Sequence, residues 1–585
     1  MHLKMKRARC SYILGLCMMA AGGAYAQKAL PAAPQGQPAK AACDRQFGDT
    51  IFSRAFGRII SLDGQWEIAA GTRNKMPRNF PGTVPVPGLV SAAQPAFQQV
   101  GQPSALREVF WYRKKFRVPG PVPEAARLKV FKAMYGSRVY LNGKAVGENA
   151  YNFTPGIFNI KPFLKGNNAE NELLICIGAY IGAAADTVVN GGEPERHAYP
   201  PGIYDRVEVI LSGTPYIVHT QVVPDIINKQ ARIVITAAST VLEPKDLPLK
   251  AEIFEYETGK PAGSGSCTVQ AVTKGVTATA EVTIPVERCR LWTPEHPNLY
   301  VLRISGEGYS YQTRFGMRKY QVDTSFTNRA LLNGKPYYIR GTNFAIHRFF
   351  SDPLCKEHPW DKAWVRQLIR TFTGMGMNGA RFCISPAPEL WYDIADEEGL
   401  MVFDEYPIWY AYQPDVGDVS RMAEDPRKKW GIWPHKITAA RLAAEYAQWM
   451  QERWNHASVV VWATPNETWT PVTGAAIRQV RKLDLSNRPW DNGWSPPVAA
   501  ADIREAHPYF ESYVPGTEQQ HNRPIGPAPF RLADLPSKEK VPATFYLPYQ
   551  HAYKQPVNWY WQQPVIINEY AYLWLNRDGS ATTLT

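Results

Sequence analysis

Apolar and polar residues alternate with a period of two in many short runs between about residues 57 and 322, and turn residues separate these runs. Alternation of this kind is typical of half-buried β-strands. At 138–147 two runs flank Asn142-Gly143, a strong hairpin signal because both residues tolerate positive φ. Further runs lie at 111–118, 172–177, 231–236, 249–254, 280–284 and 300–304. They predict two β-sandwiches: a jelly roll over 51–213 and a smaller immunoglobulin-like domain over 214–322.

The period changes at about residue 323, where short apolar runs begin to alternate with segments whose apolar residues share one helical face. Two such faces consist of Trp364, Val365, Leu368, Ile369 and Phe372, and of Leu442, Tyr446, Trp449, Met450 and Trp454. The apolar runs lie at 338–341, 379–382, 400–405, 459–463, 489–492, 502–504 and 564–569. Repeats of this kind predict parallel β/α units, and hence a (β/α)8 TIM barrel over 323–585. Only sixteen residues follow Glu569, so we expect the last β/α unit to be absent, either in an open barrel or in a piece of a longer chain.

The first 26 residues resemble an export signal. Basic residues at 4–9 precede an apolar stretch at 12–21, and Ala24-Tyr25-Ala26 provides the small residues of a cleavage site. The apolar stretch is too short for a membrane anchor, which needs roughly 20 residues. Residues 27–50, rich in Ala, Pro and Gln, are expected to form a flexible linker. The mature chain is therefore expected to be secreted or periplasmic, with no segment inserted in a membrane.

The formal net charge is +13, of which Lys4, Lys6, Arg7 and Arg9 lie in the signal. The remaining excess could favour an anionic polysaccharide or a membrane surface. Because Lys and Arg form no block, a diffusely charged surface is the simpler interpretation, and nothing supports a nucleic-acid partner.

The chain has eight cysteines, and the six that follow the signal are scattered without the spacing of a metal site. Cys267 and Cys289 lie close together within one predicted β domain. An exported protein could join them in a disulfide, although buried free thiols are an equal alternative.

Two glutamates follow predicted barrel strands: Glu467 comes after the run at 459–463, and Glu569 ends the run at 564–569. The carboxyl ends of barrel strands meet at one mouth, where the chemistry of such folds takes place. Two carboxyl groups from different strands are what hydrolysis of a glycosidic bond requires, one to protonate the leaving oxygen and the other to act at the anomeric carbon. By spacing alone, surface or salt-bridged glutamates are the simpler interpretation.

Several motifs, in order along the chain, resemble glycoside hydrolase family 2, the group of β-galactosidases, β-glucuronidases and β-mannosidases. The run Arg453-Trp454-Asn455-His456 through Asn466-Glu467 is similar to the family's acid/base signature, and the run 564–570 is similar to its nucleophile strand. Other matching runs lie at 62–66, 84–88, 111–113, 141–147, 202–205, 291–300, 314–318 and 332–343. The resemblance implies a retaining, exo-acting β-glycosidase whose partner is a glycan.

The resemblance also implies roles for single residues. Glu467 would be the acid/base and Glu569 the nucleophile, with Asn466 on the sugar 2-hydroxyl and Arg381 holding the carboxylate of Glu569. The remaining candidates for sugar contacts are His507, Tyr509, Asp404, Trp494 and His347.

The sequence departs from the family at three places that matter for specificity and metal binding. Phe344, Ala345 and Ile346 replace a basic residue, a His and an acid, and a His that typically follows Arg381 is replaced in the run 382–386. The identity of the sugar therefore stays open, and His347 is the candidate to compensate. Trp409 and Ala411 stand where some β-galactosidases bind magnesium, and neither side chain can bind a hard cation. We therefore expect no metal and no cofactor.

A non-catalytic carbohydrate-binding protein is the alternative from another class. The presence of Arg381, Asn466, Glu467 and Glu569 together argues against it, because only catalysis requires all four. The sequence does not determine the oligomeric state.

Overall fold

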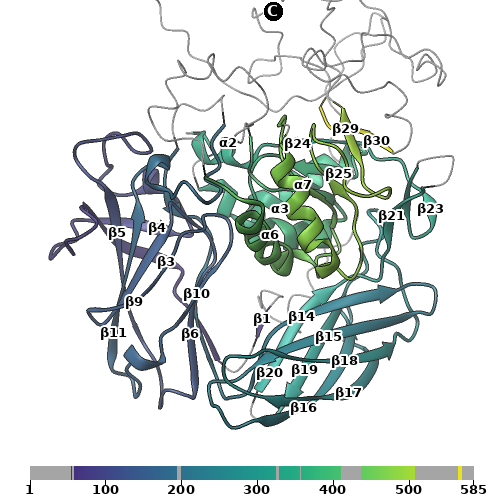
Figure 1. Ribbon diagram of the computed structural model, residues 1–585, viewed down its shortest axis with the longest axis horizontal. Helices are drawn as coiled ribbons and strands as arrows, with labels where there is room; N and C mark the ends of the chain where they lie inside the picture. Colours follow the sequence, from purple (N-terminus) through teal and green to yellow (C-terminus); the bar gives the residue numbers. More distant parts are fainter. Residues whose placement is uncertain are drawn as a thin grey trace, which may run out of the picture.

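The computed structural model describes residues 54–55, 58–193, 199–307, 309–324, 329–352, 354–355, 357–409, 436–468, 470–506 and 564–569. It shows two β-sandwiches and an α/β unit, with the first sandwich beside the α/β unit and the second beneath it (Figure 1). The predicted signal and linker, together with His507, Tyr509 and Ala411, lie outside the described residues.

The first sandwich contains a six-stranded and a four-stranded antiparallel sheet. Its core is formed by inward side chains of both sheets, among them Trp66, Phe110, Tyr112, Leu128 and Ile175. The hairpin predicted at Asn142-Gly143 is confirmed, since both residues have positive φ and join β8 to β9. The larger sheet has the order β4 (Gly82–Val86), β3 (Gly64–Gly71), β5 (Val109–Arg117), β11 (Glu170–Gly178), β8 (Ser137–Leu141) and β9 (Lys144–Asn149), and the smaller has β10 (Gly156–Asn159), β6 (Ala125–Val130), β13 (Val207–Ser212) and β2 (Arg58–Ser61).

The second sandwich pairs a five-stranded sheet with a three-stranded one. Sequence patterning did not indicate four of its strands: β1 (Arg54–Ala55), β14 (Tyr216–Asp225), β17 (Pro261–Val272) and β20 (Tyr309–Phe315). Two of these show the reason. β1 precedes the first sandwich in the chain but pairs with β20, and β17 is rich in Gly and Ser rather than in alternating apolar residues. Gly263 is needed there, because a Cβ atom would lie 2.3 Å from the Pro285 carbonyl oxygen. The five-stranded sheet has the order β1, β20, β19 (Tyr300–Gly306), β16 (Lys245–Glu255) and β17. The three-stranded sheet has the order β14, β15 (Gln230–Ala238) and β18 (Ala278–Pro285).

The α/β unit begins after a small antiparallel sheet and contains, within the described residues, seven parallel strands in sequential order. Five form one sheet, and a parallel bridge between Asp491 and Ile503 connects the fifth strand to the last two. The strands are β24 (Gly341–Phe344), β25 (Gly379–Phe382), β26 (Met401–Glu405), β27 (Val459–Ala463), β28 (Trp490–Asp491), β29 (Arg504–Ala506) and β30 (Val565–Ile567), and the small sheet has β21 (Tyr320–Val322), β22 (Ala330–Leu332) and β23 (Lys335–Pro336).

The first of these strands was predicted three residues too early. Instead of pairing in the sheet, Ile339 packs beneath the strands with Trp292, Leu332 and Met401. Pairing starts only at Gly341, opposite Gly379.

Helices cover the outer face of the parallel strands, as βαβ connections require. They are α2 (Ile346–Ser351), α3 (Lys362–Gly374), α4 (Glu389–Glu398), α6 (Ala439–Arg453) and α7 (Pro471–Val480). The side chain of Asp361 caps α3 by accepting from the backbone N–H groups of Ala363 and Trp364. No helix in the described part of the chain is long and apolar enough to span a membrane.

Side chains alternate between the two faces of each strand. On β25 and β26, Phe382 and Asp404 face the helices, where Phe382 packs on Trp391. The intervening residues face inward, where Met401, Phe403, Val461, Ile503 and Ile566 belong to one apolar cluster. This alternation decides which polar side chains reach the mouth.

Buried ion pairs join the α/β unit to both sandwiches. Lys132 of the first sandwich is 2.5 Å from Asp205 and 3.3 Å from Glu389 of α4. Arg314 of the second sandwich lies 2.6 Å from Glu397 at the other end of that helix. Lys132, Asp205, Glu389 and Arg314 are nearly inaccessible and Glu397 is partly buried, so these pairs fix the two sandwiches on α4.

All five cysteines that the structure describes are free thiols: Cys176, Cys267, Cys289, Cys355 and Cys383. Cys267 and Cys289 are therefore two free thiols and are not joined in a disulfide.

Candidate active site

Arg381 is the centre of a polar cluster at the carboxyl ends of the parallel strands. It lies on β25 and its side chain is 4 % exposed. Nη1 donates to Glu569 Oε1 at 2.8 Å, while Nη2 donates to Asn466 Oδ1 at 2.7 Å and to Glu405 Oε1 at 2.5 Å. One guanidinium therefore joins side chains from three other strand ends, and its contact with Glu569 agrees with the prediction that Arg381 holds this carboxylate.

Asn466 and Glu467 follow β27 in a backbone held on both sides. The Asn466 N–H donates to the Ile408 carbonyl, and the Thr468 hydroxyl donates to the Asn466 carbonyl. Glu467 has a φ of +38°, in the left-handed region that L-residues rarely adopt. Strained conformations of this kind cluster at functional sites.

Glu569 lies just beyond β30, and its side chain is 20 % exposed. Because its carboxylate meets a guanidinium that also holds Asn466, the two sequence-distant motifs that contain the candidate carboxylates meet at one strand-end cluster.

Four further polar residues of this cluster were not among the candidates from sequence: Glu405, Asp491, Glu505 and Asn568. The Glu405 carboxylate contacts Arg381 and also accepts from the Ile384 N–H at 2.6 Å. The Asn568 Nδ2 donates to Asp491 Oδ2 at 2.7 Å and to Glu505 Oε2 at 2.8 Å. Glu405, Asp491 and Asn568 lie within strands predicted from the sequence and Glu505 directly follows one, so a strand-end signal was available.

The electrostatics of the cluster reflect one cation among several acids. Burial raises the pKa of Glu405 to about 7, although Arg381 opposes the shift. Burial, and then the nearby Glu505, raise the pKa of Asp491 well above its ordinary value. Burial alone would lower the pKa of Arg381, but Glu405 and the other acids raise it, so this residue stays charged.

Asp404 was a candidate sugar contact, and this prediction is wrong. The residue is fully buried, with Oδ1 accepting from the Tyr392 hydroxyl at 2.6 Å and Oδ2 from Trp449 Nε1 at 2.8 Å. Because neighbours on a strand point to opposite faces, Asp404 faces the helices and Glu405 faces the interior.

His347 and Trp494 lie near strand ends but differ in their surroundings. His347 on α2 is 3 % exposed, and its Nε2 is 2.8 Å from Glu193 of the first sandwich. That pairing places it in a contact between domains instead of on an open surface. Trp494 follows β28 and is half-buried.

No group of three or more His, Cys, Asp or Glu side chains within the described residues is arranged to hold a metal ion. Trp409, where a magnesium ligand stands in some relatives, packs instead with Cys383 and Ile384.

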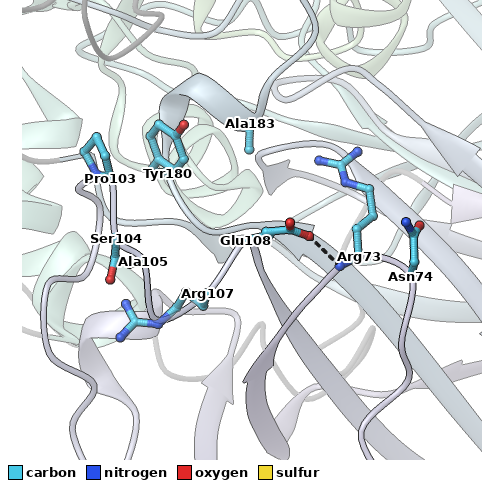
Figure 2. A pocket seen from close by; sticks show the side chains of 9 residues that line it. All are labelled: Arg73, Asn74, Pro103, Ser104, Ala105, Arg107, Glu108, Tyr180 and Ala183. Carbon is cyan, nitrogen blue, oxygen red and sulfur yellow. Dashed lines mark hydrogen bonds between the residues drawn. The ribbon is translucent and has the colours of Figure 1, made fainter.

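A hollow of about 650 Å³ lies on the first sandwich and is separate from the Arg381 cluster (Figure 2). Arg73 and Asn74 line one side, and Tyr180 and the loop 103–105 line the other. The Glu108 carboxylate accepts the Arg73 N–H at 3.0 Å. The barrel strands contribute nothing to this lining, so the hollow is not the candidate active site.

Comparison with known families gives two matches in chain order. The profile described as "Glycosyl hydrolases family 2" matches residues 215–318, and "Glycosyl hydrolases family 2, TIM barrel domain" matches residues 326–502. This chain belongs to glycoside hydrolase family 2. The prediction of the family from its motifs is confirmed, and the architecture is that of β-sandwiches followed by a TIM-barrel domain.

Named relatives of this family 2 chain include two β-galactosidases. The one from Enterobacter cloacae is 30% identical over 229 residues, 38% of this chain and 20% of the relative. The one from Thermoanaerobacter pseudethanolicus is 26% identical over 315 residues, 52% of this chain and 40% of the relative. The chain thus matches only a fifth to two fifths of the length of these proteins.

Solved structures show the same fold. A β-D-glucuronidase of Dictyoglomus thermophilum superposes with a TM-score of 0.61 at 18% identity, covering 91% of this chain and 86% of that one. A β-glucuronidase of Ruminococcus gnavus has a TM-score of 0.59 at 20% identity, covering 79% of each chain.

Proposed function

We propose that this family 2 chain is a retaining, exo-acting β-glycosidase that hydrolyses O-glycosyl bonds of oligo- or polysaccharides, with Glu569 as nucleophile and Glu467 as acid/base. The observation that carries the proposal is the pair of hydrogen bonds from Arg381 to Glu569 and to Asn466, the residue before Glu467. These bonds bring the Glu569 carboxylate and the Asn466 amide together, and Glu467 is the next residue along the chain.

In the first step, the Glu569 carboxylate attacks the anomeric carbon while the bond to the leaving oxygen breaks and Glu467 donates its proton to that oxygen. In the second step, Glu467 removes a proton from water, which attacks the anomeric carbon and releases Glu569. A cation next to a carboxylate favours its ionised form, so the contact with Arg381 keeps Glu569 ready to attack.

The side-chain amide of Asn466 has a defined orientation in this scheme. Its Oδ1 accepts from Arg381, which leaves the Nδ2 group as the donor for a substrate hydroxyl. The family resemblance assigns this contact to the sugar 2-hydroxyl, where it would strengthen in the transition state.

The names of the relatives indicate only the class of substrate, a β-linked glycoside, and not the particular sugar. Those relatives are named β-galactosidase and β-D-glucuronidase, and residues 344–346 of this chain lack the polar side chains expected of those enzymes. We propose that the substrate is a β-linked glycan outside the cell, which the protein reaches by export with the N-terminal signal.

In this scheme the first sandwich is a jelly roll and the second is immunoglobulin-like, and the parallel strands belong to a (β/α)8 barrel.

The test is hydrolysis of aryl β-galactoside, β-glucuronide, β-mannoside, β-glucoside and α-L-arabinoside by the full chain, with Glu569→Gln as control. NMR of the first-formed product would show whether the anomeric configuration is retained. Turnover of one glycoside, absent from the control, supports the proposal. Binding without turnover by the folded chain would favour a non-catalytic carbohydrate-binding protein.

A further inference from the structure

A buried polar layer lies directly above the apolar interior of the strands. Ile503 and Ile566 belong to that apolar cluster, and the next inward positions on the same strands hold Glu505 and Asn568. Asp491 on β28 completes the group. Asp491 and Glu505 are 1 % and 5 % exposed as whole residues, so both carboxyl groups depend on protein donors instead of water.

The Asn568 amide supplies these donors. Its single Nδ2 atom carries two hydrogens, and these reach Asp491 Oδ2 at 2.7 Å and Glu505 Oε2 at 2.8 Å. Asp491 is held from the other side by the Gly493 N–H, which donates to Oδ1 at 3.1 Å. The two acids come from neighbouring strands, so the amide ties the end of β30 to both β28 and β29.

The same layer reaches Arg381. Glu505 Oε2, which accepts from Asn568, also lies 3.8 Å from Arg381 Nη2. The chain near Glu569 is thus fixed at two points. Arg381 holds the carboxylate of Glu569, and Asn568 holds the backbone directly before it.

We propose that Asn568 is a positioning residue for Glu569 and acts through its paired hydrogen bonds to Asp491 and Glu505. This inference rests on the function proposed above. Losing the amide would remove one donor from each of two buried carboxyl groups and let the end of β30 move. A displacement of about 1 Å in a reacting group can cost roughly a hundredfold in rate.

The charges around the layer give the proposal a second, independent readout. Arg381 is the cation that faces it, and the acids that face it are Glu405, Glu505, Glu569 and Asp491. Asn568→Asp would add a further carboxyl group to this set. The added charge would disfavour ionisation of Glu569, so the acid limb of the kcat/KM profile would shift to higher pH.

The experiment compares the full chain with Asn568→Asp, with the double variant Asn568→Asp/Asp491→Asn, and with Asn378→Asp as a matched control. The double variant exchanges donor and acceptor across one of the two contacts. Asn378 is a buried asparagine, whereas Asn568 is half-buried, and the Asn378 Nδ2 likewise donates to an oxygen, the Tyr338 carbonyl at 3.0 Å; Asn378 precedes β25 at the opposite end of the strands. Each protein is assayed for kcat, KM, the pH profile and the thermal midpoint.

We expect Asn568→Asp to lower kcat by roughly 10- to 100-fold with little change in KM and to shift the acid limb of the kcat/KM profile to higher pH. The double variant should regain part of the lost kcat. Asn378→Asp should lower the thermal midpoint without moving the acid limb. Wild-type kinetics in Asn568→Asp, no recovery in the double variant, or identical behaviour of the control would overturn the inference while leaving the proposed hydrolase intact. A wild-type chain without glycosidase activity would overturn both.

Discussion

Arg381 Nη1 lies 2.8 Å from the Glu569 carboxylate, and this contact joins the second of the parallel strands to the last one described. The other terminal nitrogen of the same guanidinium contacts Asn466 and Glu405. The orientation of the proposed nucleophile therefore depends on Arg381.

Replacing that side chain should disable the site even when its charge is kept. A lysine at 381 presents a single ammonium group and cannot contact three partners in one plane as arginine does. We expect Arg381→Lys to lower kcat by roughly 100-fold, the size of loss typical when one preorganised donor is removed from an active site. Steady-state kinetics would test this, with Arg370→Lys, at a half-exposed position on α3, as the control. Equal kinetics in the two variants would contradict the role of Arg381.

The two carboxylates should respond differently to the leaving group. Without Glu467, leaving oxygens that need a proton lose assistance, whereas good leaving groups such as dinitrophenolate depart unaided. Glu467→Gln should therefore lose far more activity on an alkyl glycoside than on a dinitrophenyl glycoside. Glu569→Gln should lose both because it removes the nucleophile. Rates for the two substrates measure the contrast, and a uniform loss in Glu467→Gln would argue against its role as acid.

Stability should fall between about pH 5 and pH 8 because of Glu445 on α6. Burial raises the pKa of this carboxyl from 4.5 to about 8, although the Tyr406 hydroxyl and the Val189 N–H both donate to it. The folded state holds the proton more tightly than the unfolded state. The resulting stabilisation is complete below the unfolded pKa and is lost as the pH rises through the folded pKa.

Glu445→Gln should flatten that decline in the thermal midpoint, since an amide does not titrate. Thermal denaturation at several pH values between about 5 and 8 would measure this. Glu287→Gln, at an exposed position, is the control and should keep the wild-type slope. An unchanged slope in Glu445→Gln would mean that this group is not the source.

The contact between the first sandwich and α4 should depend on Lys132. Its side chain is 3 % exposed and lies between Asp205 and Glu389. Lys132→Met would leave both carboxylates without this cation, and breaking a buried pair costs about 3–5 kcal/mol. Lys115→Met removes a half-exposed pair with Glu170 and should cost far less, because solvent screens an exposed pair. Calorimetric unfolding compares them, and equal losses would contradict the difference in burial.

The strands were predictable from the sequence where the signal was local. Alternation and the Asn142-Gly143 turn place the hairpin of β8 and β9, and helical periodicity places α3 and α6. β17 was not predictable in this way, because its Gly and Ser residues allow close packing that creates no apolar pattern. Pairing of β1 with β20 depends on a contact between chain segments far apart in sequence.

The candidate site was predictable to the level of strand ends but not of single neighbours. Asp404 and Glu405 both end β26, and only the direction of the strand decides that Glu405 faces Arg381. The pair of His347 and Glu193 spans two domains, which no local pattern shows. The clamp formed by Asn568 likewise joins strands that are distant in sequence.

The most direct measurement is mass spectrometry of the full chain after incubation with an activated 2-deoxy-2-fluoro-β-glycoside of the sugar that it hydrolyses. The fluorine slows release of the glycosyl-enzyme more than its formation from a good leaving group, so the intermediate accumulates. We predict one added glycosyl group, located by peptide sequencing on Glu569 and absent from Glu569→Gln. Label on a different residue, or an inverted first product with no label, would contradict the assignment of Glu569 as the nucleophile.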